Sequence, residues 1–156
     1  MKPSEALRYD HKQLRRKLSL LHDLLPRVQA KRMAAARIVN SLAVQLRSHS
    51  ETEERLLEKT TLYSRKGTGN RIDSLLRLHD EHENHRTRLA VLHKLLTQEN
   101  PACDAQQVAA QAGYLQADLE ALMREEEDTL FPLIDREINT AQKTHREELM
   151  EHLGMA

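Results

Sequence analysis

Apolar residues recur at alternating steps of three and four along most of this 156-residue chain. That spacing places them on one side of a helix, and it predicts helices with a single buried face. Four long helices are predicted, at about 4–25, 31–59, 71–97 and from about 104 onward, with Pro132 either kinking or ending the last one. Pro26, the segment YSRKGTGN at 63–70 and the segment QENPACD at 98–104 interrupt the pattern and predict the connections between them.

Helices of twenty-odd residues with short connections are typical of an antiparallel up-down four-helix bundle. We therefore predict an all-α fold, with the bundle occupying residues 1–138 and a helical tail occupying 139–156. Within the tail, Asn139 to Leu153 are expected to form a short extra helix. No long internal repeat is visible in the sequence.

The phase of the apolar pattern assigns an inner face to each predicted helix. The first helix presents Leu7, His11, Leu14, Leu18 and Leu21. The second presents Ala35, Ile38, Leu42, Leu46 (or Gln45), His49, Glu53 and Leu56. The third presents Ile72, Leu75, Leu78 or His79, His82, His85 or Arg86, Leu89 and Leu92. The fourth presents Val108, Leu115, Leu119, Leu122, Glu126, Leu130 and Leu133.

Five polar residues from all four helices interrupt these apolar faces, namely His11, His49, Glu53, His82 and Glu126. An unpaired imidazole or carboxylate in a core carries a heavy desolvation cost, so such positions need a partner. Inward histidines and carboxylates are how helix bundles hold iron or manganese, and a carboxylate can bridge two ions. A single histidine on an apolar face is more often a hydrogen-bonded core residue than a ligand. The metal-site interpretation therefore depends on the coincidence of all five.

The segment HDEHENH, residues 79–85, contains three histidines and three acids. His82 is the member that falls on the predicted inner face. His79 and His85 lie three residues to either side of it, on adjoining helical faces. We interpret them as either additional ligands or exposed neighbours.

Charge and cysteine content narrow the range of partners. The chain has 24 basic and 24 acidic residues and no net charge, which gives no electrostatic case for nucleic acid or an anionic membrane. No apolar run approaches the roughly 18 residues that a membrane span needs, and the start shows no signal-peptide pattern. The single cysteine, Cys103, excludes an internal disulfide and favours a reducing cytoplasm.

Four short motifs carry a resemblance to a known family. They are LRYDHKQLRRKL at 7–18, LRSHSETEERLL at 46–57, HDEHENHRTRL at 79–89 and LMREEEDTLFPLI at 122–134. In this order and at these separations they resemble the helices of the hemerythrin-like (HHE, cation-binding) family. The resemblance covers roughly residues 4 to 136.

The resemblance implies a set of metal ligands. His11, His49 and His82 would be imidazole ligands, and Glu53 and Glu126 would be carboxylates that bridge a non-haem di-iron centre. The fourth motif departs from the family, which has histidine where this chain has Leu122. Oxygen-carrying members also use a second histidine on the third helix, and Leu78 stands at that position.

Leu122 cannot coordinate a metal, and three interpretations remain open. His79 or His85 replaces the missing imidazole, the site holds one metal rather than two, or the site has degenerated into a structural bundle. The cofactor expected is iron, with one or two ions, while zinc and manganese fit the same residue types.

Three classes of function follow from these observations. The favoured one is a protein that binds or senses iron, dioxygen, nitric oxide or a related small molecule, with a homodimer left open; a stress protein like the iron–sulfur repair branch of the family is its lower-ranked form. The second class is a metal-free scaffold or interaction protein. The third, a conventional enzyme, has less support, because the Glu-x-x-His pairs of di-iron oxidases, the HExxH motif and the P-loop are all missing. No catalytic residue is predicted.

Overall fold

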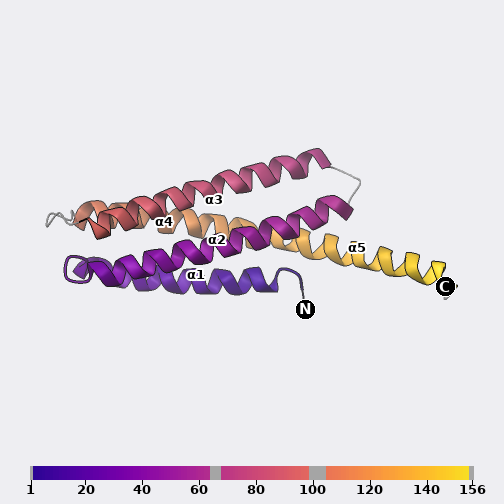
Figure 1. The fold of residues 1–156 in the computed structure, drawn as a ribbon, viewed down its shortest axis with the longest axis horizontal. Coiled ribbons are helices and arrows are strands. Elements are labelled where there is room, and N and C mark those ends of the chain that lie inside the picture. The colour runs from indigo at the N-terminus through magenta and orange to yellow at the C-terminus, as the bar shows by residue number, and fades with distance from the viewer. Residues whose placement is uncertain (1, 64–67, 99–104, 155–156) are drawn as a thin grey trace.

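The computed structural model describes residues 2–63, 68–98 and 105–154, with side chains at all of these positions except 61–63, 68–76, 78, 79 and 141. Four long helices account for most of it: α1 at Glu5–Leu24, α2 at Arg32–Tyr63, α3 at Thr68–Thr97 and α4 at Ala105–Glu125. Helix α1 packs against α2 and α4, and α3 packs against α2 and α4 (Figure 1). Every described element is helical, so the predicted all-α bundle is confirmed.

The connections follow the predicted interruptions with one change. A short 3₁₀ turn, η1 at Leu25–Arg27, holds Pro26 and ends the first helix where the sequence predicts. The predicted loop 63–70 is longer than the structure allows, because Tyr63 ends α2 and Thr68 already begins α3. Gly69 therefore lies in a helix, where its cost of about 1 kcal/mol relative to alanine is tolerated near the end. The segment around Cys103 lies outside the described residues.

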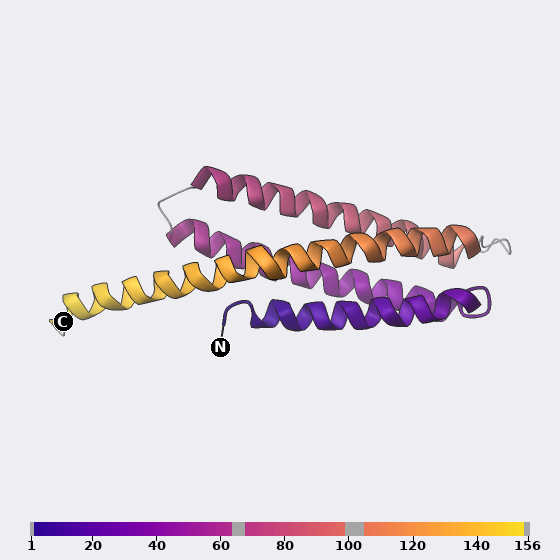
Figure 2. The ribbon, with the colours of Figure 1, turned by 180° about the vertical axis from the view of Figure 1, so that it is seen from behind.

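The fourth helix does not stop at Pro132. It passes from α4 into a π-helical segment, η2 at Glu126–Leu130, and continues as α5 at Phe131–His152 (Figure 2). Pro132 lies in the first turn of α5, where its missing N–H costs little. The α-helical hydrogen bonding is interrupted just before the proline, as expected of a residue that cannot donate to the preceding turn. The last part of α5 extends beyond the other helices (Figure 2).

The π-helical segment changes which residues of the fourth helix face inward. A π turn takes in an extra residue, so the buried face beyond it shifts by one position. The buried residues are Phe131, Ile134 and Ile138, whereas the predicted Leu130 and Leu133 are only half-buried. The prediction for this part of the helix was wrong because it assumed one unbroken α-helical period. The predicted extra helix at 139–153 is helical in the structure, but it belongs to α5.

The predicted inner faces of the other helices hold well. All five inner residues of α1 are buried. On α2, Leu46 is buried as predicted, while Val39 and Leu57 take the buried places assigned to Ile38 and Leu56. On α3, the described inner residues are buried, namely His82, His85, Leu89 and Leu92. The side chains of Ile72, Leu75, Leu78 and His79 lie outside the described residues.

The apolar core is divided into two clusters. The larger cluster fills one end of the bundle with aliphatic side chains from all four helices, including Leu14, Leu46, Leu89 and Met123. The smaller one consists of Leu7, Leu57, Phe131, Ile134 and Ile138. His11 follows Leu7 and precedes Leu14 on α1, and on α2 His49 and Glu53 lie between Leu46 and Leu57. The core is thus apolar above and below a single polar layer.

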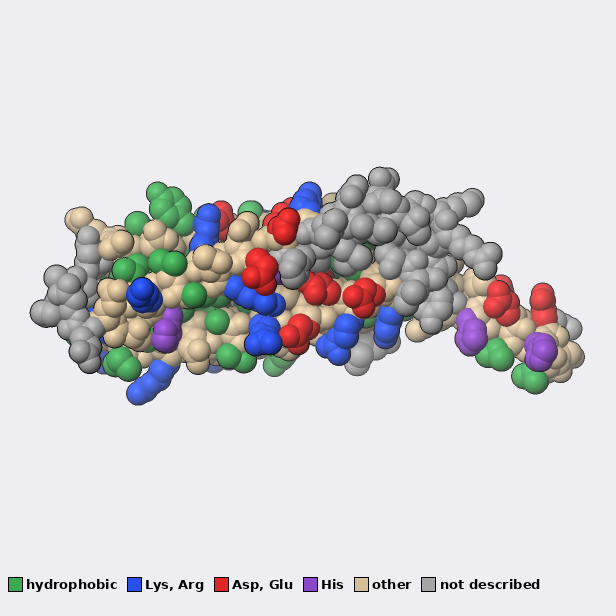
Figure 3. Space-filling model, turned by 45° about the horizontal axis from the view of Figure 1, so that its top comes forward, with side chains coloured by type: hydrophobic (Ala, Val, Ile, Leu, Met, Phe, Trp, Pro, Cys, Tyr) green, Lys and Arg blue, Asp and Glu red, His purple; other side chains and the backbone are tan. Residues whose placement is uncertain are grey.

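On the face that Figure 3 shows, acidic and basic side chains are interspersed along the described part of the bundle. In the described part of the chain, no helix has both the length and the apolar character needed to cross a membrane. The proposed boundary between residues 138 and 139 lies within α5 and stays a prediction.

Phe131 provides a test of the smaller apolar cluster. Its side chain is fully buried and its ring centroid lies 5.0 Å from that of His11, so truncation leaves a cavity beside the polar layer. We expect Phe131→Ala to lower the free energy of unfolding by about 3–5 kcal/mol in urea denaturation. Val44, which is 65% exposed, supplies the control: Val44→Ala should change stability by no more than about 0.5 kcal/mol. Equal effects of the two substitutions would contradict this packing.

Candidate metal centre

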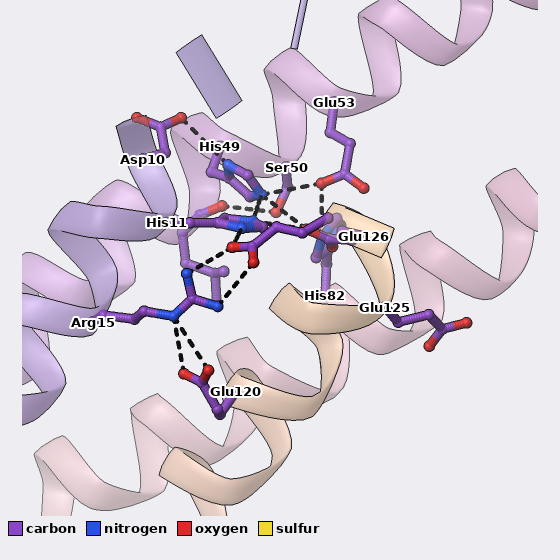
Figure 4. A network of polar contacts seen from close by, with 12 residues as sticks. Asp10, His11, Arg15, His49, Ser50, Glu53, His82, Glu120, Glu125 and Glu126 are labelled. Carbon is purple, nitrogen blue, oxygen red and sulfur yellow. Dashed lines mark hydrogen bonds and ion pairs between the residues drawn. The ribbon is translucent and has the colours of Figure 1, made fainter. Parts of the chain in front are cut away.

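The polar layer contains all five residues that the sequence singled out. His11 comes from α1, His49 and Glu53 from α2, His82 from α3, and Glu126 from the first position of η2. Each is at least 97% shielded from solvent, and their side chains converge between the helices (Figure 4). The predicted inward position of each residue is thus confirmed, whereas its role as a metal ligand stays a prediction.

One group of donor atoms is formed by His11, His49 and Glu126. His11 Nε2 lies 2.9 Å from Glu126 Oε2, and His49 Nε2 lies 3.3 Å from the same oxygen. The two Nε2 atoms are 3.3 Å apart. The donor atoms of the group all lie within 4.8 Å of one another, a spacing that a single cation can span with small side-chain movements.

A second group is formed by Glu53, His82 and Glu126, again with its donor atoms within 4.8 Å of one another. His82 Nε2 lies 3.9 Å from Glu53 Oε2 and 3.9 Å from Glu126 Oε1. Glu126 thus faces the first group with Oε2 and the second group with Oε1. A carboxylate in this position can bridge two ions.

Unsatisfied polar atoms are concentrated in the second group. Both oxygens of Glu53, both ring nitrogens of His82 and Glu126 Oε1 are buried without a hydrogen-bond partner. Glu53 Oε2 does lie 3.0 Å from His49 Nε2, but as an ion-pair contact. Buried polar groups in folded proteins are nearly always satisfied, so this concentration needs an explanation. A bound cation would satisfy these atoms together, and the donor set fits one.

The pKa values show how the layer distributes charge. Burial raises the pKa of Glu53 to about 7, with the contact to His49 opposing the rise and the charge of Glu126 adding to it. Burial acts in the same direction on Glu126, but the imidazoles of His11, His49 and His82 hold its pKa well below the usual range. Of the two carboxylates, Glu126 is therefore the one whose ionised form the layer favours. Glu53 would lose a proton when it accepts a cation.

The outer ring nitrogens of the three histidines face a further set of carboxylates. His11 Nδ1 lies 2.8 Å from Glu127 Oε1, His49 Nδ1 3.3 Å from Asp10 Oδ2, and His82 Nδ1 4.0 Å from Glu54 Oε1. A carboxylate at hydrogen-bond distance from Nδ1, as at His11 and His49, favours the tautomer that donates N–H outward. With a cation bound, Nε2 of these two rings would then present its lone pair to it. At His82 the 4.0 Å separation is an ion-pair contact and not a hydrogen bond.

These outer carboxylates were missed in the sequence, although a signal was present. Asp10 precedes His11, Glu54 follows Glu53 and Glu127 follows Glu126. A neighbour of an inward helical residue is rotated by about 100° and so faces the adjacent helix. Each acid therefore supports a histidine on a different helix from its own. Pairing every candidate ligand with its adjacent acid would have identified all three.

Arg15 holds in place Glu127, the carboxylate that contacts His11 Nδ1. Its guanidinium donates to both oxygens of Glu127, with the shorter contact at 2.6 Å, and to Glu120 at 3.1 Å. Arg15 and His11 together lower the pKa of Glu127 against the opposing effect of burial. Glu127 is thus held as an anion against the His11 ring.

Leu122 and its surroundings differ from the rest of the layer. Leu122 is buried one turn before Glu126, and the two line a cavity of about 230 Å³ together with Glu81. His85 is buried beside it, in an adjoining cavity of about 270 Å³, and belongs to neither donor group. The proposal that His85 replaces the missing imidazole stays a prediction, and the side chain of His79 lies outside the described residues.

Comparison with known proteins gives one match. A family model described as the hemerythrin HHE cation binding domain matches residues 2–81 and again residues 73–155. The chain belongs to the hemerythrin HHE family. No curated protein and no solved structure matches it.

The two halves of this hemerythrin-family chain carry motifs that can be compared directly. The first half carries Asp10-His11 and then His49 four residues before Glu53-Glu54. The second half carries Glu81-His82 and then Leu122 four residues before Glu126-Glu127. The halves thus share their motifs, with one exception at Leu122. The absence of a visible long repeat is explained by how few positions the halves have in common.

Glu127 provides a test of the outer carboxylates. We expect Glu127→Ala to weaken Co²⁺ binding by roughly 10- to 100-fold, because His11 loses the group that orients its ring. The measurement is a Co²⁺ titration followed by visible absorption, in competition with a chelator. Asp128→Ala is the matched control, since Asp128 is an exposed acid next in the chain. Identical affinities of the two variants would show that Glu127 does not position His11.

Proposed function

We propose that this protein holds non-haem iron in its polar layer and uses it to bind or sense dioxygen, nitric oxide or iron itself. The single observation that carries the proposal is the position of Glu126, which turns one oxygen to each of two donor groups. Bridging by one ionised carboxylate is what a two-ion centre in a helix bundle requires. Membership of the family supports cation binding in general, and the choice of iron as the cation is our proposal.

The choice of iron is supported by the mixture of ligands. Three imidazoles and two carboxylates form the layer, and this combination suits iron, while zinc and manganese remain compatible with it. When bound, iron would supply a change of oxidation state and an open coordination position for a small molecule. The apolar clusters above and below the layer would keep water from reaching that position along the length of the bundle.

The residues of the layer would divide their roles. His11 and His49 would hold one ion and His82 the other, with Glu126 and Glu53 between them. Asp10 and Glu127 would keep the rings of His49 and His11 in orientation through Nδ1. Because Leu122 offers no donor, the position at His82 has fewer protein ligands than its family pattern implies. We infer that the His11 position fills first and the His82 position binds more weakly.

A metal-free scaffold is the second candidate, and Leu122 is the observation that favours it. Polar residues can fix helix pairing and register without a metal. Such residues are normally satisfied by one another, however, and Glu53 and His82 retain unpartnered buried atoms. These atoms support the iron proposal over the scaffold. A cytoplasmic location, favoured by the single Cys103, is part of the proposal.

Anaerobic titration with Fe²⁺, followed by elemental analysis after gel filtration, tests the function. We expect a tighter and a weaker phase, with His11→Ala removing the first and His82→Ala the second, because each substitution deletes one ligand. His93→Ala, also on α3 but outside both groups, should match the unmodified protein. Retention of less than roughly 0.2 iron per chain by the unmodified protein would reject the proposal.

A further inference from the structure

The relation between the two halves of the chain identifies an acid whose partner is missing. In the first half, Asp10 supports His49 across the helices, at 3.3 Å from Nδ1. In the second half, Glu81 stands where Asp10 stands, directly before the inward histidine, and Leu122 stands where His49 stands. Glu81 therefore has the position of a supporting carboxylate, but the imidazole that it would support does not exist.

The surroundings of Glu81 agree with this reading. Its Oε2 atom is buried and has no hydrogen-bond partner in the described structure. The other oxygen, Oε1, lies 3.8 Å from Arg77 Nε, and Arg77 also pairs with Glu125. Among the supporting acids, Asp10 and Glu127 each reach a histidine, whereas Glu81 has no hydrogen bond to a histidine whose side chain the structure describes. An acceptor that is left unsatisfied within a protein is ready to accept a donor from a ligand.

A cavity of about 230 Å³ lies beside Leu122, the residue that stands in place of the imidazole. Glu81 and Glu126 also line it, and the remaining polar lining is Arg77, Glu125 and Thr129. A cavity of roughly 150 Å³ already accommodates a benzene ring, so a five-membered ring fits here. Leu57, Leu130 and Leu133 supply apolar walls for the faces of such a ring. The adjoining cavity at His85 shares Glu81, Leu122 and Glu125 with this one and is likewise lined by residues of α3 and α4.

We propose that this cavity is a binding site for a small nitrogen heterocycle of the imidazole type, which takes the place of the absent histidine side chain. Such a ring carries a lone pair on one nitrogen and an N–H on the other. The lone pair would face the donor group of Glu53, His82 and Glu126, and the N–H would donate to Glu81 Oε2. The inference rests on the proposed function, because the lone pair needs a cation in that group.

The first half of the chain provides an internal comparison. There, His49 already fills the corresponding place and Asp10 is already paired. A free imidazole therefore has a reason to bind beside His82 and none to bind in the same manner beside His11. The site exists because residue 122 is a leucine and not a histidine. A ring introduced at that residue should therefore close the site.

Imidazole itself is the probe. N-methylimidazole is the control compound, because it keeps the nitrogen lone pair but has no N–H to donate. The full-length protein is loaded with Fe²⁺ without oxygen, its iron content is measured, and each probe is titrated by isothermal calorimetry. We expect imidazole to saturate one site per chain. N-methylimidazole should bind at least roughly tenfold more weakly, because it cannot donate to Glu81.

Three variants locate the site. Glu81→Ala should weaken imidazole binding to the level of N-methylimidazole, so that the two probes no longer differ. Glu83→Ala, an exposed acid on the same helix, should leave the difference intact. Leu122→His should abolish imidazole binding because its own ring fills the cavity, and Leu122→Phe should do the same without adding a donor.

The possible failures are distinguishable. Imidazole and N-methylimidazole binding equally well to the iron-loaded protein would overturn the role of Glu81. Unchanged imidazole binding in both Leu122→His and Leu122→Phe would overturn the location. Normal iron loading with either result leaves the proposed function standing and removes this inference alone. A failure of the unmodified protein to retain iron overturns both.

Discussion

The structure depends on one buried anion. Glu126 is held in its ionised form by imidazoles from three helices, in a layer that is closed on both sides by apolar side chains. A carboxylate in such a place is stable only when the groups around it supply compensating hydrogen bonds or charge. Each of the four long helices therefore has to present a polar residue at the same depth. This requirement fixes the register of the bundle more strictly than leucine packing alone would.

The π-helical segment meets a related constraint on the fourth helix. Glu126 has to point into the layer while its neighbour Glu127 reaches His11 from the other side of the ring. The wide turn at Glu126–Leu130 begins at these residues and re-phases the helix before Phe131 enters the smaller apolar cluster. π-helical turns are rare in proteins as a whole, but those that do occur are often found at functional sites. Here it lets a single helix contribute both the bridging carboxylate and a carboxylate that orients a ligand.

Periodicity in the sequence was sufficient for the bundle and for the five residues of the polar layer, because helical spacing alone decides which residues share a face. It gave the wrong buried residues at Leu130 and Leu133, because it assumed 3.6 residues per turn throughout and could not detect a π turn. It also missed Asp10, Glu54 and Glu127, whose contacts cross from one helix to the next. The unpaired oxygen of Glu81 could not be predicted either. That atom is recognised only when the packing of α3 against α4 shows what surrounds Leu122.

If cations occupy the layer on either side of Glu126, X-ray diffraction from crystals of the iron-loaded protein should locate them, with anomalous difference maps on both sides of the iron absorption edge. We expect a strong peak between His11, His49 and Glu126, and a weaker one between Glu53, His82 and Glu126. Iron located only at surface carboxylates, with this layer free of anomalous density, would contradict it.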